Sequence, residues 1–419
     1  MTRIPSGQPL ARFFVLAYSK YGGDDVQRDA GLGKIYASGM LFNICYLMFA
    51  VLIPLDAVHE HLAVWMVGVL AAIPGVMQLP SRILSGPLVD WLGERFVLRM
   101  TFMLALGAAL AVVGGQIAPM AGLVLGQLFM GAARGFFWTA AQTGASRDPD
   151  HRAQHLGMFT SFTKGGALIG IALSGLLAQL LGIMGGFALT GGLGFLALII
   201  GWVLPKHVSA ARPQKLWEAV RALAPAMHKP FIILNGLVAL LCALPQALAQ
   251  SFYPVVLIHR GLSDPTASLM TALMSFGMIV AGLLGAGAIR RWGMKHIVEG
   301  GAALLAIGLA GTAWHNLIGT AMAIFAAGFA AGVLNIAFLS AVSSRSRDGD
   351  RGTNLGVTQI YFVLAMMLTP LISGWLFAAS GSAAAFLVDG GLAAAVGLVV
   401  MVLWNWSEPK SRTTVGETA

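Results

Sequence analysis

The sequence predicts an all-α membrane protein with twelve transmembrane helices, arranged as two parallel six-helix repeats. Three observations support this: a charge-poor composition, twelve apolar segments of spanning length, and similarity between the two halves of the chain. Of the 419 residues, 57% are hydrophobic and 10% are charged, and the mean hydropathy is +0.79. A soluble domain carries about 25% charged residues. This chain therefore cannot cover a globule with polar surface, and lipid must surround it.

A spanning helix needs about 20 mostly apolar residues, and twelve segments meet that need. The predicted spans are 35–56, 62–82, 97–117, 119–144, 154–181, 184–204, 231–258, 266–288, 297–314, 317–342, 354–379 and 383–406. A basic, proline-containing segment separates the sixth span from the seventh. The predicted domains are an N-terminal tail (1–34), a first six-helix half (35–204), a central loop (205–229), a second half (230–406) and a C-terminal tail (407–419).

The distribution of positive charge predicts the orientation of the helices. Lys and Arg are retained in cytoplasmic loops. With a cytoplasmic N-terminus, all but three of the 26 lie in cytoplasmic loops, tails or helix ends. Arg260 lies in an outward loop, and Arg134 and Lys164 lie inside spans. We expect a multi-pass protein of a bacterial inner membrane with both termini cytoplasmic. Because the basic residues are scattered over alternate loops, no nucleic-acid partner is expected.

The fifth and eleventh predicted spans resemble each other when the chain is shifted by 199 residues. The segment HRAQHLGMFTSFTKGGALIGIALSGLL pairs with DRGTNLGVTQIYFVLAMMLTPLISGWL, so that Gly157 matches Gly356 and Ser174 matches Ser373. The two halves are therefore predicted to be parallel repeats. Such repeats usually hold a substrate site near the midplane, at their interface, and expose it to each side in turn.

The loop between the second and third predicted spans reads GPLVDWLGERFVLR. Gly86 and Gly93 allow a tight turn, and Asp90 can accept hydrogen bonds from a helix N-terminus or pair with Arg95. The loop is similar to the cytoplasmic signature of the major facilitator superfamily, and the resemblance extends over essentially the whole chain. It implies that family's twelve-helix fold, secondary active transport by alternating access, and a cytoplasmic latch formed by these four residues.

Two cations are predicted near the bilayer midplane. Arg134 and Lys164 each lie about ten residues from the inner end of their span, hence about 15 Å deep. A Lys at the bilayer centre costs at least roughly 2.5–3.5 kcal/mol, and no acid is predicted at this depth. We therefore expect a small anionic substrate, because Arg binds carboxylate or phosphate bidentately and Lys adds a point charge. The alternatives are a structural link to polar neighbours, or Lys164 as a titrating coupling group.

Polar and aromatic residues are expected around these cations. Gln127 lies seven residues before Arg134, nearly two turns, and so shares its face. By the repeat, Arg134 corresponds to Asn335 and Lys164 to Val363, which predicts a cavity cationic on one side and neutral on the other. Aromatic rings at Tyr46 and Phe162 are expected on the first-half wall. The predicted substrate-binding residues are Arg134, Lys164, Gln127, Asn43, Trp138, Asn335, Gln359 and Tyr361.

Asp56 and Asp389 lie toward the outer ends of the first and twelfth spans and are the candidates for proton coupling. If neither titrates, exchange of one anion for another is expected instead. The sequence shows no cluster typical of a metal site or a cofactor, and none is expected. The chain is expected to function as a monomer that binds a small molecule.

Other functions remain open. One alternative is a proton-coupled exporter of drugs or metabolites, which would need a large aromatic cavity. Another is a copper importer, because Met270, Met274 and Met278 form a stripe at i, i+4 and i+8, and thioethers bind copper(I). Such stripes are more often adaptable packing. A non-transporting scaffold with this fold is a further alternative. A membrane enzyme is not expected, because the chain has no acid cluster and no large extramembrane loop.

Overall fold

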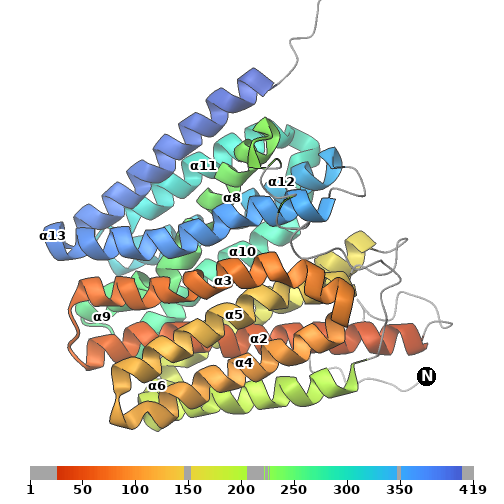
Figure 1. Cartoon of the computed structure of the whole chain (residues 1–419). Helices are drawn as coiled ribbons and strands as arrows, with labels where there is room; N and C mark the ends of the chain where they lie inside the picture. Colours follow the sequence, from red (N-terminus) through yellow and green to blue (C-terminus); the bar gives the residue numbers. More distant parts are fainter. Residues whose placement is uncertain are drawn as a thin grey trace, which may run out of the picture.

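The computed structural model describes residues 26–145, 152–204, 221, 225, 227–346 and 351–407, and the regular elements of this part of the chain are all helices. The first half contains α2 (Val26–His59), α3 (Val64–Leu92), α4 (Glu94–Gly114), η1 (Gly115–Ile117), α5 (Pro119–Ala145) and α6 (Arg152–Val203). The second half contains α8 (Pro230–Ala249), α9 (Phe252–His259), α10 (Asp264–Trp292), α11 (Met294–Gly311), α12 (Leu317–Arg345) and α13 (Arg351–Ser407). Figure 1 shows the two halves side by side.

The described helices make twelve membrane crossings. Nine of the helices are long and apolar enough to span a membrane. Two of the nine, α6 and α13, contain two spans each, because each turns back at a glycine with positive φ, Gly182 at 73° and Gly381 at 80°. The helix α11, whose first turns are charged, supplies the twelfth. The predicted all-α fold with two six-helix halves is therefore confirmed, and the protein is a multi-pass integral membrane protein.

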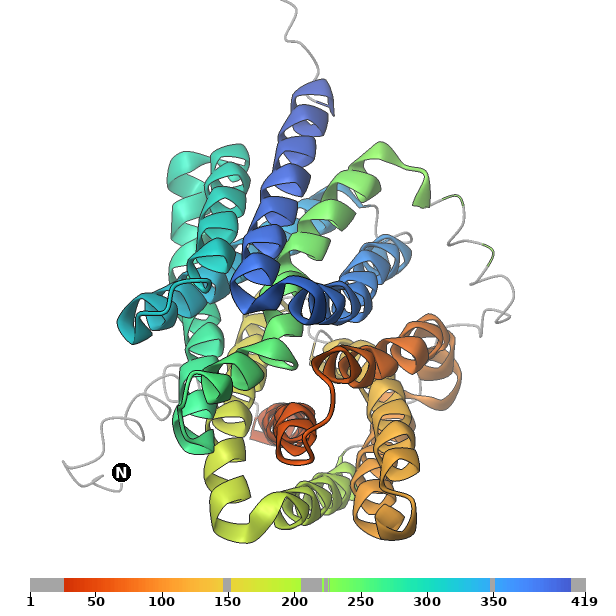
Figure 2. The same ribbon diagram turned by 90° about the vertical axis from the view of Figure 1, so that its left-hand side faces the viewer.

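Corresponding glycines hold the helices of each half close together. A Cβ at Gly131 on α5 would lie 2.2 Å from the carbonyl oxygen of Pro74 on α3, and one at Gly328 on α12 would lie 2.1 Å from that of Met274 on α10. Only glycine allows backbones to approach so closely. Viewed from the side of the α2–α3 turn, the two halves lie next to each other with related helix arrangements (Figure 2).

These contacts refine the match between the repeats. Gly131 and Gly328 are 197 residues apart and make equivalent contacts. At that shift, Ala331 stands at the place of Arg134, four residues before the predicted counterpart Asn335. Four residues are about one helical turn, so both positions share a face of α12. The second half therefore supplies an alanine, and no cation, opposite Arg134.

Three helices differ clearly from the predicted spans. The helix α3 ends at Leu92, ten residues past the predicted end of the second span. The helix α2 begins at Val26, nine residues before the predicted start, because a helix can continue past the apolar segment into polar surroundings. The seventh span is broken between α8 and α9. Pro254 has no N–H to bond the carbonyl of Gln250, and the hydroxyl of Ser251 donates to the Ala247 carbonyl at 2.8 Å. Gln250, the residue that follows α8 at this break, lines a cavity together with residues of the first half.

The halves meet closely toward their outer ends, where outer and inner follow the predicted orientation. A Cβ at Gly68 on α3 would lie 2.3 Å from the carbonyl oxygen of Pro370, and one at Gly175 on α6 would lie 2.0 Å from that of Asp264. His59 Nε2 lies 3.0 Å from Asp264 Oδ2 and joins α2 to α10. The structure is therefore closed on the outer side.

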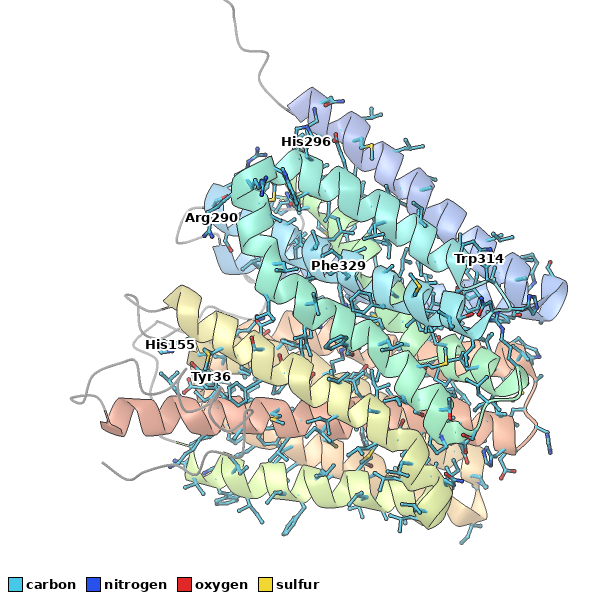
Figure 3. The ribbon with its side chains drawn as sticks, turned by 180° about the vertical axis from the view of Figure 1, so that it is seen from behind. Tyr36, His155, Arg290, His296, Trp314 and Phe329 are labelled. Atoms are coloured by element: carbon cyan, nitrogen blue, oxygen red, sulfur yellow. The ribbon has the colours of Figure 1, made fainter. Side chains whose placement is uncertain are left out.

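Labelled side chains in Figure 3 mark the two ends of the molecule. Tyr36, His155, Arg290 and His296 lie toward one end and Trp314 lies at the other. At the outer end, the guanidinium of Arg260 donates to the carbonyls of Thr312 and Trp314, 2.9 and 2.8 Å away. Arg260 thus caps the C-terminal end of α11. This role explains a positive charge on the side that otherwise lacks Lys and Arg.

Candidate functional site

The interface between the halves contains a polar cluster centred on Arg134. This side chain is 6% exposed and donates to the hydroxyl of Tyr46 and, at 3.4 Å, to Oε1 of Gln250. The Tyr46 hydroxyl itself donates to Gln250 Oε1 at 2.6 Å. The guanidinium carbon also lies 4.6 Å from the centroid of the Tyr46 ring and 5.9 Å from that of Phe362. The cluster therefore links α2 and α5 of one half to α8 and α13 of the other.

Lys164 extends the cluster along the same interface. Its ammonium donates to Gln246 Oε1 at 3.4 Å and lies 3.7 Å from Met278 Sδ. Gln246 is one turn from Gln250 on α8 and donates to the Cys242 carbonyl at 3.1 Å. Both cations of the first half thus contact glutamines of the second half. Among the described residues, the hydrogen-bond partners of these two cations are all neutral.

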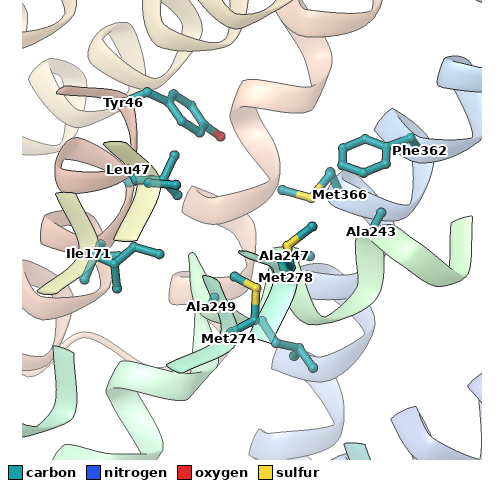
Figure 4. Close-up of a cluster of buried hydrophobic side chains, with 14 of the residues drawn as sticks. Tyr46, Leu47, Ile171, Ala243, Ala247, Ala249, Met274, Met278, Phe362 and Met366 are labelled. Atoms are coloured by element: carbon teal, nitrogen blue, oxygen red, sulfur yellow. The ribbon is translucent and has the colours of Figure 1, made fainter. Parts of the chain in front are cut away.

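A small cavity of about 20 Å³ lies between these groups, which is room for a water molecule rather than an organic substrate. Figure 4 shows Tyr46 facing Met278, Met274 and Phe362 across the interface. The described conformation is therefore nearly closed around the cluster. The cavity is lined by Phe42, Asn43, Tyr46, Leu47, Arg134, Trp138, Lys164, Ala167, Gln246, Gln250, Met274, Ser275 and Met278.

The structure gathers some of the predicted binding residues and places others elsewhere. Arg134, Lys164, Asn43 and Trp138 line the cavity. Gln127 donates to the Leu70 carbonyl at 2.9 Å and so ties α5 to α3 within the first half.

The predicted second-half residues lie outside the cavity lining. Asn335 accepts a long bond from the Cys242 thiol at 3.7 Å, and Gln359 is partly buried. Tyr361 packs its ring on Gly236 of α8. The neutral wall is instead formed by Gln246 and Gln250, which the sequence reasoning missed. Two glutamines four residues apart in an apolar span, next to Pro245, were the available signal.

The predicted cytoplasmic latch is described in part. Gly93 adopts a φ of 81° and makes the turn between α3 and α4, as Gly293 does at 79° between α10 and α11. A Cβ at Gly86 would have no neighbouring heavy atom within 4 Å among the described residues. Arg95 donates to the Trp202 carbonyl at the end of α6, within the same half. The side chain of Asp90 lies outside what the structure describes.

The two predicted coupling acids lie far from the cations along the helices, toward the outer ends. Asp389 is 2% exposed, and both its oxygens accept from the Ser373 hydroxyl, at 3.1 and 3.0 Å. Asp56 is also buried and lies one turn before His59 on α2.

The methionine stripe faces the interior. Met270, Met274 and Met278 are all buried, and the last two line the cavity. The ammonium of Lys164 beside Met278 Sδ would repel a copper(I) ion. Among the described residues, no group of three His, Cys, Asp or Glu side chains could hold a metal ion.

A twelve-helix fold made of two six-helix repeats, with a polar cluster at their interface, is the architecture of alternating-access secondary transporters. The sequence profile of the Major Facilitator Superfamily matches residues 35–255 and 236–419, and the chain belongs to that family. No curated protein matches the sequence.

Solved structures share the fold. The nucleoside transporter NupG is 15% identical, with a TM-score of 0.73, and the match covers 89% of this chain and 99% of that one. The human organic anion transporter MFSD10 is 17% identical, with a TM-score of 0.66 and coverage of 89% and 99%. A D-xylose–proton symporter is 16% identical, with a TM-score of 0.68 and coverage of 88% and 96%. Membership of the Major Facilitator Superfamily makes the protein a transporter.

Proposed function

We propose that this transporter moves a small organic anion across a bacterial inner membrane, and that Arg134 and Lys164 bind it. The observation that carries the proposal is the pair of interior cations whose partners across the interface are all neutral. Among the described residues, the one ion pair joins His59 to Asp264 at the outer surface. A buried charge without a counterion is costly. An anionic substrate would supply the missing counterion.

The geometry also suggests how binding is coupled to movement. The bonds from Arg134 and Lys164 to Gln250 and Gln246 cross from one half to the other. Rocking of the halves would break these bonds and expose both cations to the inner side. An arriving anion would then bind the cations, and the glutamine amides would donate to its oxygens when the halves close. Neutral partners suit this exchange because they compete only weakly with an anion for hydrogen bonds from the two cations.

Asp389 is our candidate for a coupling proton. Its carboxyl is buried in the second half and accepts a hydrogen bond from the neutral hydroxyl of Ser373. If rocking of the halves opens this site to water, the carboxyl could exchange its proton there. The organic anion transporter among the structural neighbours gives no independent support for an anion, because at 17% identity the likeness concerns the fold alone.

Thermal stability of the purified protein tests the proposal. Ligands that bind the native state raise the melting temperature by mass action. The panel contains butyrate, succinate, benzoate, phenyl phosphate, xylose, a nucleoside, a cationic drug and copper(I). The variants are Arg134→Gln and Lys164→Met, with Arg290→Gln as the control, because Arg290 is exposed at the inner end of α10.

At least one organic anion should raise the melting temperature of the wild type and of the control. The same anion should leave the melting temperatures of both site variants unchanged. Equal stabilisation of all four proteins by a neutral or cationic compound would contradict it. In that case the D-xylose or nucleoside chemistry of other family members would become the better hypothesis.

A further inference from the structure

Arg82 is a third interior cation, outside both the predicted site and the cavity lining. It lies on α3 ten residues before the inner end at Leu92, hence about 15 Å from that end. Arg134 lies eleven residues before the inner end of α5, and Lys164 lies twelve residues after the inner start of α6. Counted along their helices, the three cations have similar depths.

The position of Arg82 on α3 directs it toward the other half. Gly68, Gly75 and Arg82 are seven residues apart, and residues at that spacing share one helix face. Gly68 packs against Pro370 of α13, and Gly75 against Met367. Arg82 therefore lies on the α3 face that meets α13, about two helical turns closer to the inner end than Gly75. It belongs to the interface that opens when the halves rock.

Arg82 has no counterion among the described residues. Its side chain is partly buried and makes no hydrogen bond or ion pair with a described residue. Its backbone packs next to the residue that follows Arg134, because a Cβ at Gly135 would lie 3.1 Å from the Arg82 nitrogen. Its neighbour Ser81 is held in the tight contact between α3 and Gly135 of α5, so the helix segment that carries Arg82 is well fixed.

We infer that Arg82 binds a second negative charge of the substrate, and that this transporter prefers anions with two negative charges, such as dicarboxylates or phosphate esters. This inference rests on the proposed function. The site would hold three positive charges, on Arg134, Lys164 and Arg82. A substrate with two negative charges neutralises them better than a single carboxylate does. A guanidinium without competing acceptors can also give both parallel hydrogen bonds to a carboxylate or phosphate.

Matched pairs of anions separate this inference from the proposed function. Dissociation constants are measured in detergent for succinate against butyrate, and for phenyl phosphate against benzoate. The proteins are the wild type, Arg82→Gln, Arg82→Lys, Arg134→Gln and the surface control Arg290→Gln. Size-exclusion chromatography verifies that each variant is folded.

We expect at least one dianion to bind the wild type about tenfold or more tightly than its monoanion. Arg82→Gln should remove that preference, and leave the monoanion affinity within about twofold, while Arg82→Lys should restore part of the preference. Arg134→Gln should weaken both members of each pair.

Three results would overturn the inference. If Arg82→Gln leaves the preference intact, or lowers the affinity for both members of a pair equally, Arg82 does not bind the second negative charge. If the wild type binds monoanions through Arg134 but shows no preference for dianions, the inference fails and the proposed function stands. If no anion binds the wild type, both fail.

Discussion

Replacing Lys164 by methionine should stabilise the protein in the absence of ligand while abolishing anion binding. A Lys near the bilayer centre costs roughly 2.5–3.5 kcal/mol. Its hydrogen bond to Gln246, at 3.4 Å, returns about 1 kcal/mol. Methionine is of similar length and would pack beside Met278. The net gain is therefore about 1.5–2.5 kcal/mol. The corresponding rise in melting temperature is roughly 2–4 °C per kcal/mol for a domain of about 200 residues.

The assay is a thermal scan at fixed rate, in detergent and in a buffer low in chloride and free of organic anions. Lys34→Met is the control, because the Lys34 ammonium donates to the Val203 carbonyl at an exposed helix end and its removal should change little. A melting temperature of Lys164→Met several degrees below that of the wild type would refute the reasoning. Lys164 would then be a structural link between the halves.

Three further results are expected. Gly131→Val should prevent formation of folded monodisperse protein in size-exclusion chromatography, because its Cβ would overlap the α3 backbone; Gly300→Ala, where a Cβ meets open space, should behave as the wild type. His59→Ala should shift the equilibrium toward the outward-open state by only about 1.4- to fivefold, because an exposed contact with Asp264 contributes about 0.2–1 kcal/mol. Labelling of a reporter cysteine in the outer vestibule measures this shift, and an unchanged labelling rate would contradict it. Asp389→Asn should abolish substrate-driven proton uptake into proteoliposomes but retain exchange of labelled for unlabelled substrate, and intact proton uptake would rule out Asp389 as the coupling group.

Most of the fold could be predicted from the sequence, because lipid allows few solutions. Apolar segments of spanning length must be helices, since each backbone group has to be satisfied within its own segment. Gly93 and Gly293 mark corresponding turns with nearly equal φ values. The break at Gln250 was missed, because the apolar signal continues through α9 and hides the effect of Pro254.

The site could be predicted in its charges but only partly in its neutral groups. A cation in an apolar span is an unmistakable signal, and Arg134 and Lys164 do lie at the same cavity. Which neutral side chains face them depends on helix rotation and register between the halves, which sequence periodicity leaves undetermined. The sequence match between the repeats was out of register by about one helical turn on α12, and it therefore favoured Asn335. Arg82 was read as a helix-end charge because the predicted second span stops there.

Transport by reconstituted protein tests the central claim most directly. Proteoliposomes containing the wild type, Arg134→Gln, Lys164→Met or Arg290→Gln would be preloaded with the anion that stabilises the wild type best, and uptake of the same labelled anion would be followed. We expect rapid exchange by the wild type and by Arg290→Gln, and background uptake by the two site variants although both are folded. Exchange by Arg134→Gln or Lys164→Met at the wild-type rate would show that these cations do not bind the substrate.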